Sequence, residues 1–397
     1  MLNRTAVRVL CLLASFCLLA AFQSASLAAA PLENLAARSA VAPTQGREDA
    51  LETARSIAEE VLRHNNLPGL SVTVVRRGQE VFSQGFGSSD LEQDVPVTPQ
   101  TLFRIGSLSK LVTVAAMARL KEQGKLDWDA SPRDYLQLAD ESPLAHSPMT
   151  LRQLASHTAG VRHYLPGDPQ GCGSFVGPQG GIRLQGWDDL EAALDLFADD
   201  DLVHPPGEAY HYSTFGYTLL GAVMEKVAGQ SFEALIRQQV FDPLDMEGST
   251  TDRNIPLIEK RSEFYILHPE TGQIGNAPCN DSSYKWPGGG LLSSTSEFAA
   301  FASAHLGEGF LQSSTLEEIF TPQPKASDRD YQVGLGWRIG KDGQGRTIYH
   351  HGGAIMGGRA FVLAYPQERL VVVLFANAFA RFGRPEALRL AQLFMPQ

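Results

Sequence analysis

Residues 101–127 read TLFRIGSLSKLVTVAAMARLKEQGKLD, and this stretch decides how the rest of the chain is interpreted. Its apolar spacing predicts a buried helix over 108–123 that ends at Gly124. Ser107 and Lys110 stand at the start of that helix, one turn apart and therefore on the same face. A serine there has an unpaired backbone N–H, and a buried lysine of lowered pKa can accept the proton of its hydroxyl. One turn thus offers a nucleophile, a base and half of an oxyanion hole.

The same Ser-x-x-Lys spacing also occurs where a serine caps a helix and a lysine lies on its surface. Such pairs arise often by chance, so the spacing alone does not establish a catalytic site. Other segments of the sequence have to decide between these two interpretations.

The composition is that of an ordinary globular protein. The 397 residues are 43% hydrophobic and 19% charged, which is enough apolar material for a sizeable core. The formal net charge is −11 at pH 7, and no run of lysines or arginines opposes it. An acidic chain of this kind disfavours nucleic acid and anionic membranes as partners. We expect a small-molecule or peptide substrate as the partner instead.

The N-terminus has the three parts of a secretory signal. Arg4 and Arg8 precede an apolar stretch, VLCLLASFCLLAAF, which is followed by the small residues SASLAAA. The apolar stretch has about 14 residues, fewer than the roughly 20 that span a bilayer as a helix. We therefore expect residues 1–28 to be a signal peptide for secretion across the inner membrane to the periplasm, with no further membrane insertion. A retained anchor is the alternative.

Strand-like segments lie towards both ends of the mature chain, and helical segments lie between them. A linker over 29–50 leads into a helical pattern at 49–64, and two strands follow around a turn at Gly78. Residues 125–283 are mostly helical in pattern. From residue 286 the chain returns to strand-like pieces and closes with a helix.

This order predicts an α+β fold in which one sheet is made from both ends of the chain. Residues 51–124 and 284–397 would form an α/β sandwich, with 125–283 as an inserted, mainly helical region. Two cysteines remain after signal removal, Cys172 and Cys279. In an oxidising compartment they either form a disulfide or stay as two inert thiols, and the sequence leaves both alternatives open.

Four motifs follow one another along the chain: VPVTPQTLFRIGSLSK at 95–110, YHYSTFGYTLLG at 210–221, WPGGGLLSSTSEFAAF at 286–301 and YHHGGAIMGG at 349–358. Together they resemble the motifs of the penicillin-recognising serine hydrolases, in particular the class C β-lactamase-like branch, over about 51–395. Within that family, SHTAGVRHY, YSTFGYTLL and NDSSYKWPGGGLLSS resemble the serine β-lactamase-like proteins of animal mitochondria. Those relatives are described as peptidase-like and able to form filaments.

The resemblance implies a β-lactamase/transpeptidase-like fold, with an antiparallel sheet flanked by helices, and a reaction through an acyl-enzyme. It makes Ser107 the acylated nucleophile, Lys110 its hydrogen-bonded activator, and Tyr212 the group that relays protons to the leaving group. The backbone N–H groups of Ser107 and Gly353 would form the oxyanion hole. No metal and no cofactor are needed. A buried, hydrogen-bonded tyrosine without a catalytic role is the alternative for Tyr212.

The fourth segment contains two adjacent histidines, and its first glycine decides which of them replaces the lysine of the family motif. Counting back from Gly352, His350 takes the position of the lysine and His351 that of the variable threonine. Neighbouring side chains on a strand point to opposite faces, so we expect His350 to face the cleft and Gly352 to contact substrate. Thr214 is the second expected substrate contact. Packing of either histidine at the strand edge is the alternative.

Two departures from the family pattern argue against β-lactam hydrolysis as the main task. Thr214 stands where lactamases have an asparagine that contacts the substrate amide, and the lysine of the third family motif is missing. Zinc chemistry is disfavoured because His157, His163, His204 and His211 lack metal-binding spacing. The first two of these histidines are expected to brace loops.

We therefore expect an exported serine hydrolase that acts on an amide or ester bond, with a peptide as the first expected substrate. An esterase or a weak β-lactamase on the same site is the alternative among enzymes. A filament-forming or structural protein with a vestigial site is the alternative from another class, and a homo-oligomer or filament is the expected assembly in that case. The intact set of Ser107, Lys110 and Tyr212 favours catalysis.

Overall fold

The computed structural model describes residues 45–166, 168, 189–328 and 330–396. The predicted signal peptide, most of the predicted linker and Cys172 lie outside these ranges. Cys279 lies within them and is disulfide-bonded. The residues from Gln45 onward form one structural unit. None of the helices in the described ranges combines the length and apolarity that a bilayer-spanning helix requires.

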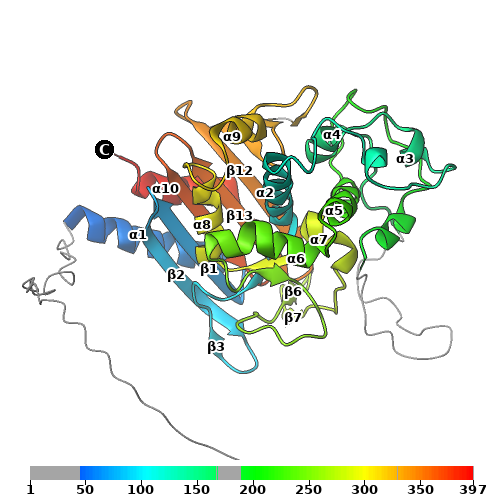
Figure 1. The fold of residues 1–397 in the computed structure, drawn as a ribbon. Coiled ribbons are helices and arrows are strands. Elements are labelled where there is room, and N and C mark those ends of the chain that lie inside the picture. Colours follow the sequence, from blue (N-terminus) through cyan, green and yellow to red (C-terminus); the bar gives the residue numbers. More distant parts are fainter. Residues whose placement is uncertain (1–44, 167, 169–188, 329, 397) are drawn as a thin grey trace, which may run out of the picture. The chain divides into compact units, whose positions relative to one another are not determined.

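A nine-stranded antiparallel sheet runs through the described part of this unit (Figure 1). Its strand order is β3-β2-β1-β14-β13-β12-β11-β10-β9. The strands are β1 Gly69–Arg76, β2 Gln79–Asp90, β3 Val95–Pro96, β9 Ser327–Asp328, β10 Tyr331–Val333, β11 Arg338–Lys341, β12 Thr347–Ile355, β13 Gly358–Tyr365 and β14 Leu370–Ala376. β1 pairs with β14 from Leu70 opposite Ala376 to Arg76 opposite Leu370. The prediction of one antiparallel sheet built from both ends of the chain is confirmed.

Helices cover both faces of this sheet (Figure 1). The α-helices are α1 Gln45–His64, α2 Ser109–Glu122, α3 Pro143–His146, α4 Leu151–Ala155, α5 Phe215–Ala228, α6 Phe232–Ile236, α7 Trp286–Gly289, α8 Thr295–Ala304, α9 Ser313–Phe320 and α10 Arg384–Leu393. The terminal helices α1 and α10 pack on one face, and α8 and α2 contribute to the core on the other.

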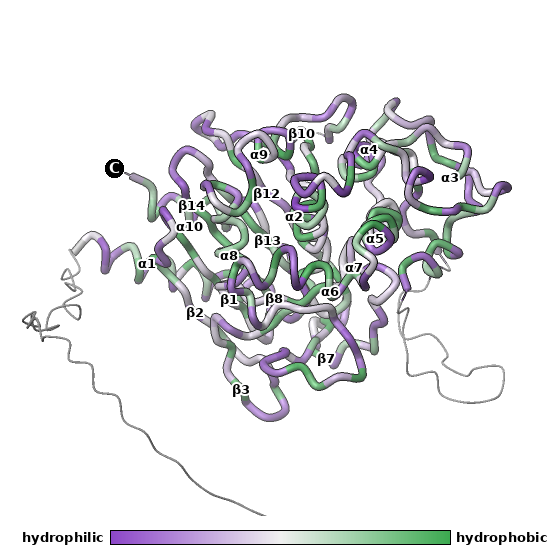
Figure 2. Tube along the Cα trace, in the orientation of Figure 1, coloured by the Kyte–Doolittle hydropathy of each residue, from purple (hydrophilic) through white to green (hydrophobic). Residues whose placement is uncertain are grey.

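Strand β14, LVVVLFA, is apolar throughout because both of its faces are covered. Leu370, Val372 and Leu374 belong to the core shared with α1 and α10. Val371, Val373 and Phe375 belong to the core shared with α2 and α8. The alternation of side chains along a strand therefore divides the interior into two layers. Figure 2 shows hydrophobic residues gathered along the central strands and along α5.

The helix predicted over 108–123 is α2, and a 3-10 turn, η1 (Gly106–Leu108), leads directly into it. Its residues are buried from Ser109 to Ala118, so the helix has no solvent-facing side over most of its length. Gly124 follows with φ +68°, the left-handed conformation in which helices commonly end. Ser107 consequently lies in the 3-10 turn and Lys110 in the first turn of α2.

The region predicted to be mainly helical contains α3 to α6 and also three short strands, β5 Thr250–Thr251, β6 Tyr265–Leu267 and β7 Ile274–Asn276. β5 pairs with β8 (Leu291–Ser293), which pairs in turn with β4 (Phe103–Arg104). The buried ion pair between Arg104 and Asp252, 2.7 Å long, joins the same segments. The boundaries of an inserted region at 125 and 283 remain a prediction.

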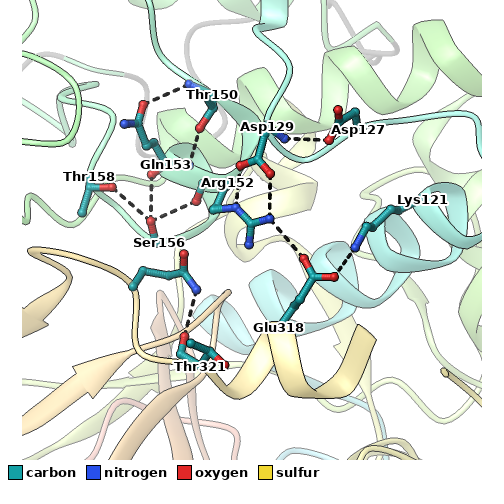
Figure 3. Close-up of polar contacts among 11 residues, drawn as sticks. Lys121, Asp127, Asp129, Thr150, Arg152, Gln153, Ser156, Thr158, Glu318 and Thr321 are labelled. Carbon is teal, nitrogen blue, oxygen red and sulfur yellow. Dashed lines mark hydrogen bonds and ion pairs between the residues drawn. The ribbon is translucent and has the colours of Figure 1, made fainter. Parts of the chain in front are cut away.

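A polar network connects α2, α4 and α9 (Figure 3). Arg152 of α4 donates to both carboxylate oxygens of Asp129 at 2.6 and 2.9 Å, and to Glu318 of α9 at 3.1 Å. Lys121 of α2 donates to the other oxygen of Glu318. Partly exposed ion pairs contribute only ~0–1 kcal/mol each. The network ties α4 to α2 and α9, and the residues that follow α4 lead into the site.

Candidate active site

Ser107 and Lys110 are brought together where η1 continues into α2. The Nζ atom of Lys110 lies 3.5 Å from Ser107 Oγ and donates to Thr214 Oγ1 at 3.2 Å. Lys110 also donates to the backbone carbonyl of Gly288 in α7. The lysine therefore links the predicted nucleophile to two further segments, one directly before α5 and one within the glycine-rich turn.

Burial lowers the pKa of Lys110. Its side chain is 0% exposed, and the acceptors around it are two hydroxyls and a carbonyl instead of carboxylates. The charge and the hydrogen bond of Tyr212 act in the opposite direction but do not outweigh burial. A lysine in these surroundings can give up its proton and then serve as a base towards Ser107.

Tyr212 lies over the same lysine, with Lys110 Nζ 4.8 Å from the centre of its ring. Burial by itself raises the pKa of Tyr212, but the charge of Lys110, hydrogen bonding with Ser107 and Lys110, and the charge of Arg338 bring the net shift downward. The structure thus brings the three predicted residues Ser107, Lys110 and Tyr212 into one cluster. A tyrosine with a lowered pKa can exchange a proton with its neighbours near neutral pH more readily than a free tyrosine.

Two histidines hold the segment that carries Tyr212. The ring of His157 lies 4.3 Å from that of Tyr212, its Nδ1 accepts the Ser213 N–H at 3.1 Å, and its carbonyl accepts the His211 N–H at 2.8 Å. The Nδ1 atom of His163 accepts the Thr214 N–H at 3.2 Å. Burial first, and then the charge of Lys110, lowers the pKa of His163 to about 4 and that of His157 well below its usual value. Both histidines are therefore neutral braces of this segment.

The adjacent histidines of β12 lie on opposite faces of the strand, and it is His351 that approaches Tyr212. The centres of the two rings are 6.5 Å apart. His350 instead stacks against Phe361 at 6.0 Å and meets Tyr331 edge-on at 5.7 Å. The expected position of His350 in the cleft is thus wrong by one residue.

Pairing with β13 explains this register. His351 stands opposite Val362, which belongs to the core layer of α2, whereas His350 stands opposite Leu363 in the layer of α1 and α10. Directly opposite residues of an antiparallel pair project to the same face. Burial first, and then the charges of Arg338 and Lys110, keeps the pKa of His351 well below its usual value, so its imidazole is neutral.

Two glycines let β12 approach the turn that carries Ser107. A Cβ on Gly106, which has φ +51°, would lie 2.8 Å from the backbone nitrogen of Ala354. A Cβ on Gly353 would lie only 1.9 Å from the carbonyl oxygen of Ile105. Gly353 is buried in this contact and Ala354 is exposed. Ala354 and the following Ile355 are therefore the residues of β12 that reach the cleft beside Ser107, and Gly353, which was expected there from the sequence, does not.

The cleft beside Ser107 has a volume of about 300 Å³. Its lining residues come from five separate parts of the chain: Ser107, His163, Tyr164, Thr214, Asn280, Lys285, Gly288, Gly289, Ala354, Ile355 and Met356. Thr214 lines the cleft, and its contact with substrate stays a prediction. Gly352 does not line it, because its Cβ position faces the ring of Phe361 at 3.5 Å.

Three polar residues of the site were not found by sequence reasoning. Arg338 of β11 lies with its guanidinium 6.0 Å from the ring centre of Tyr212. Lys285 and Asn280 line the cleft and are nearly fully buried. Their only signal in the sequence is their place in the stretch NDSSYKWPGGGLLSS. Across the described ranges, no three or more side chains of the metal-binding types gather as a group that could hold an ion.

A helix-covered antiparallel sheet that places a serine beside a buried lysine defines the class of serine hydrolases with a β-lactamase fold. Comparison with protein families agrees, because the Beta-lactamase family matches residues 54–394. The chain belongs to the β-lactamase family.

Individual relatives support this assignment. The chain is 28% identical over 409 residues to the mitochondrial serine beta-lactamase-like protein LACTB of Mus musculus, covering 82% of this chain and 74% of that protein. It is also 28% identical over 398 residues to LACTB of Homo sapiens, covering 80% and 72%.

Solved structures show the same fold. The octameric penicillin-binding protein homologue from Pyrococcus abyssi superimposes with a TM-score of 0.72 at 24% identity, over 86% of this chain and 77% of that one. EstCE1, a hydrolase with promiscuous acyltransferase activity, superimposes with a TM-score of 0.70 at 23% identity, over 88% and 99%.

Proposed function

We propose that the protein is an exported serine hydrolase that transfers the acyl part of an amide or ester to Ser107 and then to water. The observation that carries this proposal is the position of Lys110. Its amine is fully buried, has no carboxylate partner among its hydrogen bonds, and lies 3.5 Å from the hydroxyl of Ser107. Burying a charged lysine without a carboxylate partner costs free energy, and this cost is explained if the neutral form of Lys110 takes part in the reaction.

In the proposed reaction, neutral Lys110 takes the proton of Ser107 as Oγ attacks the carbonyl carbon of the substrate. The backbone N–H groups of Ser107 and Ala354 stabilise the oxyanion, because Ala354 and not Gly353 borders the cleft. Tyr212 passes its proton to the leaving group and takes up in exchange the proton that Lys110 received from Ser107. Water then gives a proton to the Lys110–Tyr212 pair as it attacks the acyl-enzyme, and the pair returns a proton to Ser107 Oγ as the acid is released.

The residues around Ser107 and the similar structures favour a broad group of acyl donors over β-lactams alone. Thr214, in place of the expected asparagine, accepts a hydrogen bond from Lys110 and has no amide with which to bind a substrate carbonyl. Similar structures include a D-stereospecific amidohydrolase from Streptomyces and EstCE1, a hydrolase with promiscuous acyltransferase activity, so amide hydrolysis and acyl transfer both occur on this fold. We propose a peptide-like amide as substrate and an ester as the second candidate, with the periplasm as the location.

A structural role is the competing proposal, and one observation favours it. The similar protein from Pyrococcus abyssi is described as octameric, so assembly into homo-oligomers is compatible with this fold. Assembly and catalysis do not exclude each other. The decisive quantity is therefore the reactivity of Ser107 itself.

The test is labelling with a fluorophosphonate probe, followed by intact-mass and peptide-mass measurement. We expect one label per chain, on the peptide that contains Ser107, and no label on the Ser107→Ala variant. A folded protein that takes up no label, or a label that persists in Ser107→Ala, would overturn the proposed mechanism. Polymers seen by electron microscopy together with an unreactive Ser107 would favour the structural role.

A further inference from the structure

A second buried lysine, Lys285, lines the cleft beside Ser107. It ends the 3-10 turn η6 (Ser283–Lys285), directly before α7, whose Gly288 carbonyl accepts the hydrogen bond from Lys110. Lys285 is 5% exposed, and its Nζ lies 5.5 Å from the ring centre of Tyr164, another residue of the cleft wall. The proposed acylation mechanism gives this lysine no role.

Lys285 forms no close ion pair with a carboxylate among the residues that the structure describes, and the charges of Asp281 and Asp252 act on it only at longer range. Asp252 is engaged by Arg104 at 2.7 Å and by Arg261 at 3.6 Å. Asp281 accepts hydrogen bonds from the backbone and hydroxyl of Ser283 at 2.9 and 2.6 Å. Burial first, and then the charge of Arg104, lowers the pKa of Lys285 to about 8. The amine therefore remains mostly protonated at pH 7, and the cleft wall carries an unpaired cation.

Asn280 provides the second, independent observation. Its side chain is 2% exposed and lines the same cleft, yet neither its Oδ1 nor its Nδ2 has a hydrogen-bond partner among the described residues. Buried amides are normally satisfied, and an orphaned one in a cleft wall points to a group that arrives with the substrate. A donor amide and a cation in the wall of one cleft are the groups that a carboxylate-binding site requires.

The position of this pair relative to Tyr212 indicates which part of the substrate it meets. Tyr212 supplies the proton to the leaving group, so the leaving group departs on the side of Tyr212 and Arg338. Tyr212 is absent from the lining of the cleft that Lys285 and Asn280 share with Ser107 and Ala354. The acyl part of the substrate is the part that remains on Ser107, and this cleft is where it lies.

We propose that Lys285 and Asn280 form an anion subsite that selects acyl donors with a carboxylate on the acyl side. The subsite rests on the proposed acyl transfer for its position, and its ligand is recognised by charge and by hydrogen bonding to the amide. The cation of this subsite comes from the segment before α7. In the family's third motif the lysine lies on a strand instead, and in this chain that strand carries His351.

Paired esters of equal chain length test the selection. We use mono-p-nitrophenyl adipate, which carries a terminal carboxylate, and p-nitrophenyl hexanoate, which does not. The wild-type protein is expected to have the higher kcat/KM for the adipate ester. Lys285→Gln should lower kcat/KM at least tenfold for adipate and less than threefold for hexanoate, and Lys285→Arg should retain part of the preference. Lys226→Gln, at an exposed lysine of α5, is the matched control and should change neither.

Asn280→Asp tests the second residue of the pair. A carboxylate at this position would occupy Lys285 and repel the carboxylate of the adipate ester, so the preference should move towards hexanoate. Melting temperatures measured for each variant separate a local effect from misfolding. Equal losses on both esters in folded variants, or no loss on either, would overturn the subsite.

Binding to the Ser107→Ala protein keeps the subsite testable if no ester is hydrolysed. The adipate ester should bind measurably in calorimetry, and the additional Lys285→Gln change should abolish that binding. Binding without turnover by the wild type would contradict the proposed hydrolase and leave the subsite standing. Turnover of hexanoate without preferential binding of adipate would contradict the subsite alone.

Discussion

His351 lies beside Tyr212 with 6.5 Å between the ring centres, while its neighbour His350 stacks on Phe361 on the opposite face of β12. The Nδ1 atom of His351 donates to the carbonyl of Gly352 at 2.9 Å, which leaves Nε2 as an acceptor. A neutral imidazole in this position can orient the phenol of Tyr212 or a substrate group without adding charge.

His351→Ala is therefore expected to lower kcat/KM at least tenfold, about 1.4 kcal/mol of transition-state stabilisation. His350→Ala should change kcat/KM less than threefold and act mainly on stability, because it removes a ring packed between Phe361 and Tyr331. Steady-state kinetics with one ester, alongside melting curves, distinguishes the two. A larger catalytic loss at His350 would refute the placement of these side chains relative to the reaction.

Lys110→Arg should abolish nearly all turnover, by at least about 100-fold, because a guanidinium stays protonated and cannot accept the proton of Ser107. In the wild type the base must be neutral, so kcat/KM should rise with pH as Lys110 loses its proton. Since burial lowers the pKa of Lys110, the midpoint of that rise should fall below the usual 10.5.

The control for this variant is its folding, checked by circular dichroism and melting temperature. The positive charge and the helix propensity are both retained, although the larger side chain must fit beside Gly288 and Thr214. Near-normal rates in a folded Lys110→Arg protein would assign the base role to Tyr212 instead.

Gly353→Ala should destabilise the protein by about 1–3 kcal/mol, because its Cβ would come within 1.9 Å of the Ile105 carbonyl oxygen. The new Cβ is attached directly to the backbone of β12, and the Ile105 oxygen is itself a backbone atom. The clash can therefore be removed only if β12 moves away from the turn that carries Ser107. Labelling of Ser107 should slow in parallel. Gly343→Ala is the matched control, since nothing lies within 4 Å of its Cβ position, and it should change the free energy of unfolding by under about 0.5 kcal/mol. Urea unfolding measures both, and equal effects would contradict the contact.

Local sequence was sufficient to predict Ser107 and Lys110 as neighbours because helical spacing determines their relation within one turn. The antiparallel sheet from both chain ends was also predictable, since strand patterns lie at both ends of the sequence. The face of β12 on which each of His350 and His351 lies could not be predicted. It depends on which residue of β13 stands opposite each histidine, and a shift of one residue in that register reverses every side chain.

Lys285 and Asn280 were missed for a different reason. They lie in a segment without helical or strand periodicity, where the spacing of residues does not indicate the direction in which a side chain points. Only the packing of η6 and α7 against α2 brings them to Ser107, and that packing involves residues more than 170 positions apart in the chain, such as Lys110 and Gly288.

The last prediction concerns pH and stability at His305, which is fully enclosed at the end of α8. Its Nδ1 donates to the Phe301 carbonyl at 2.8 Å, and its ring packs against Phe301, Phe310 and Trp337. Burial lowers its pKa to about 4, against about 6.5 in the unfolded chain. Between these values the unfolded chain binds a proton at this residue and the folded chain does not.

The free energy of unfolding should therefore fall as pH decreases from about 6.5 towards 4, by about 1.4 kcal/mol per pH unit for this one group. His305→Phe keeps the aromatic contacts and removes the titration, so its stability should depend on pH less steeply by about one proton. Urea unfolding at pH 7, 6, 5 and 4.5 measures the slope for both proteins. Gly343→Ala is the control, because it changes no titratable group and nothing lies within 4 Å of its Cβ position, so it should leave the slope as in the wild type. Parallel slopes for wild type and His305→Phe would show that His305 takes up its proton in the folded protein as readily as in the unfolded one.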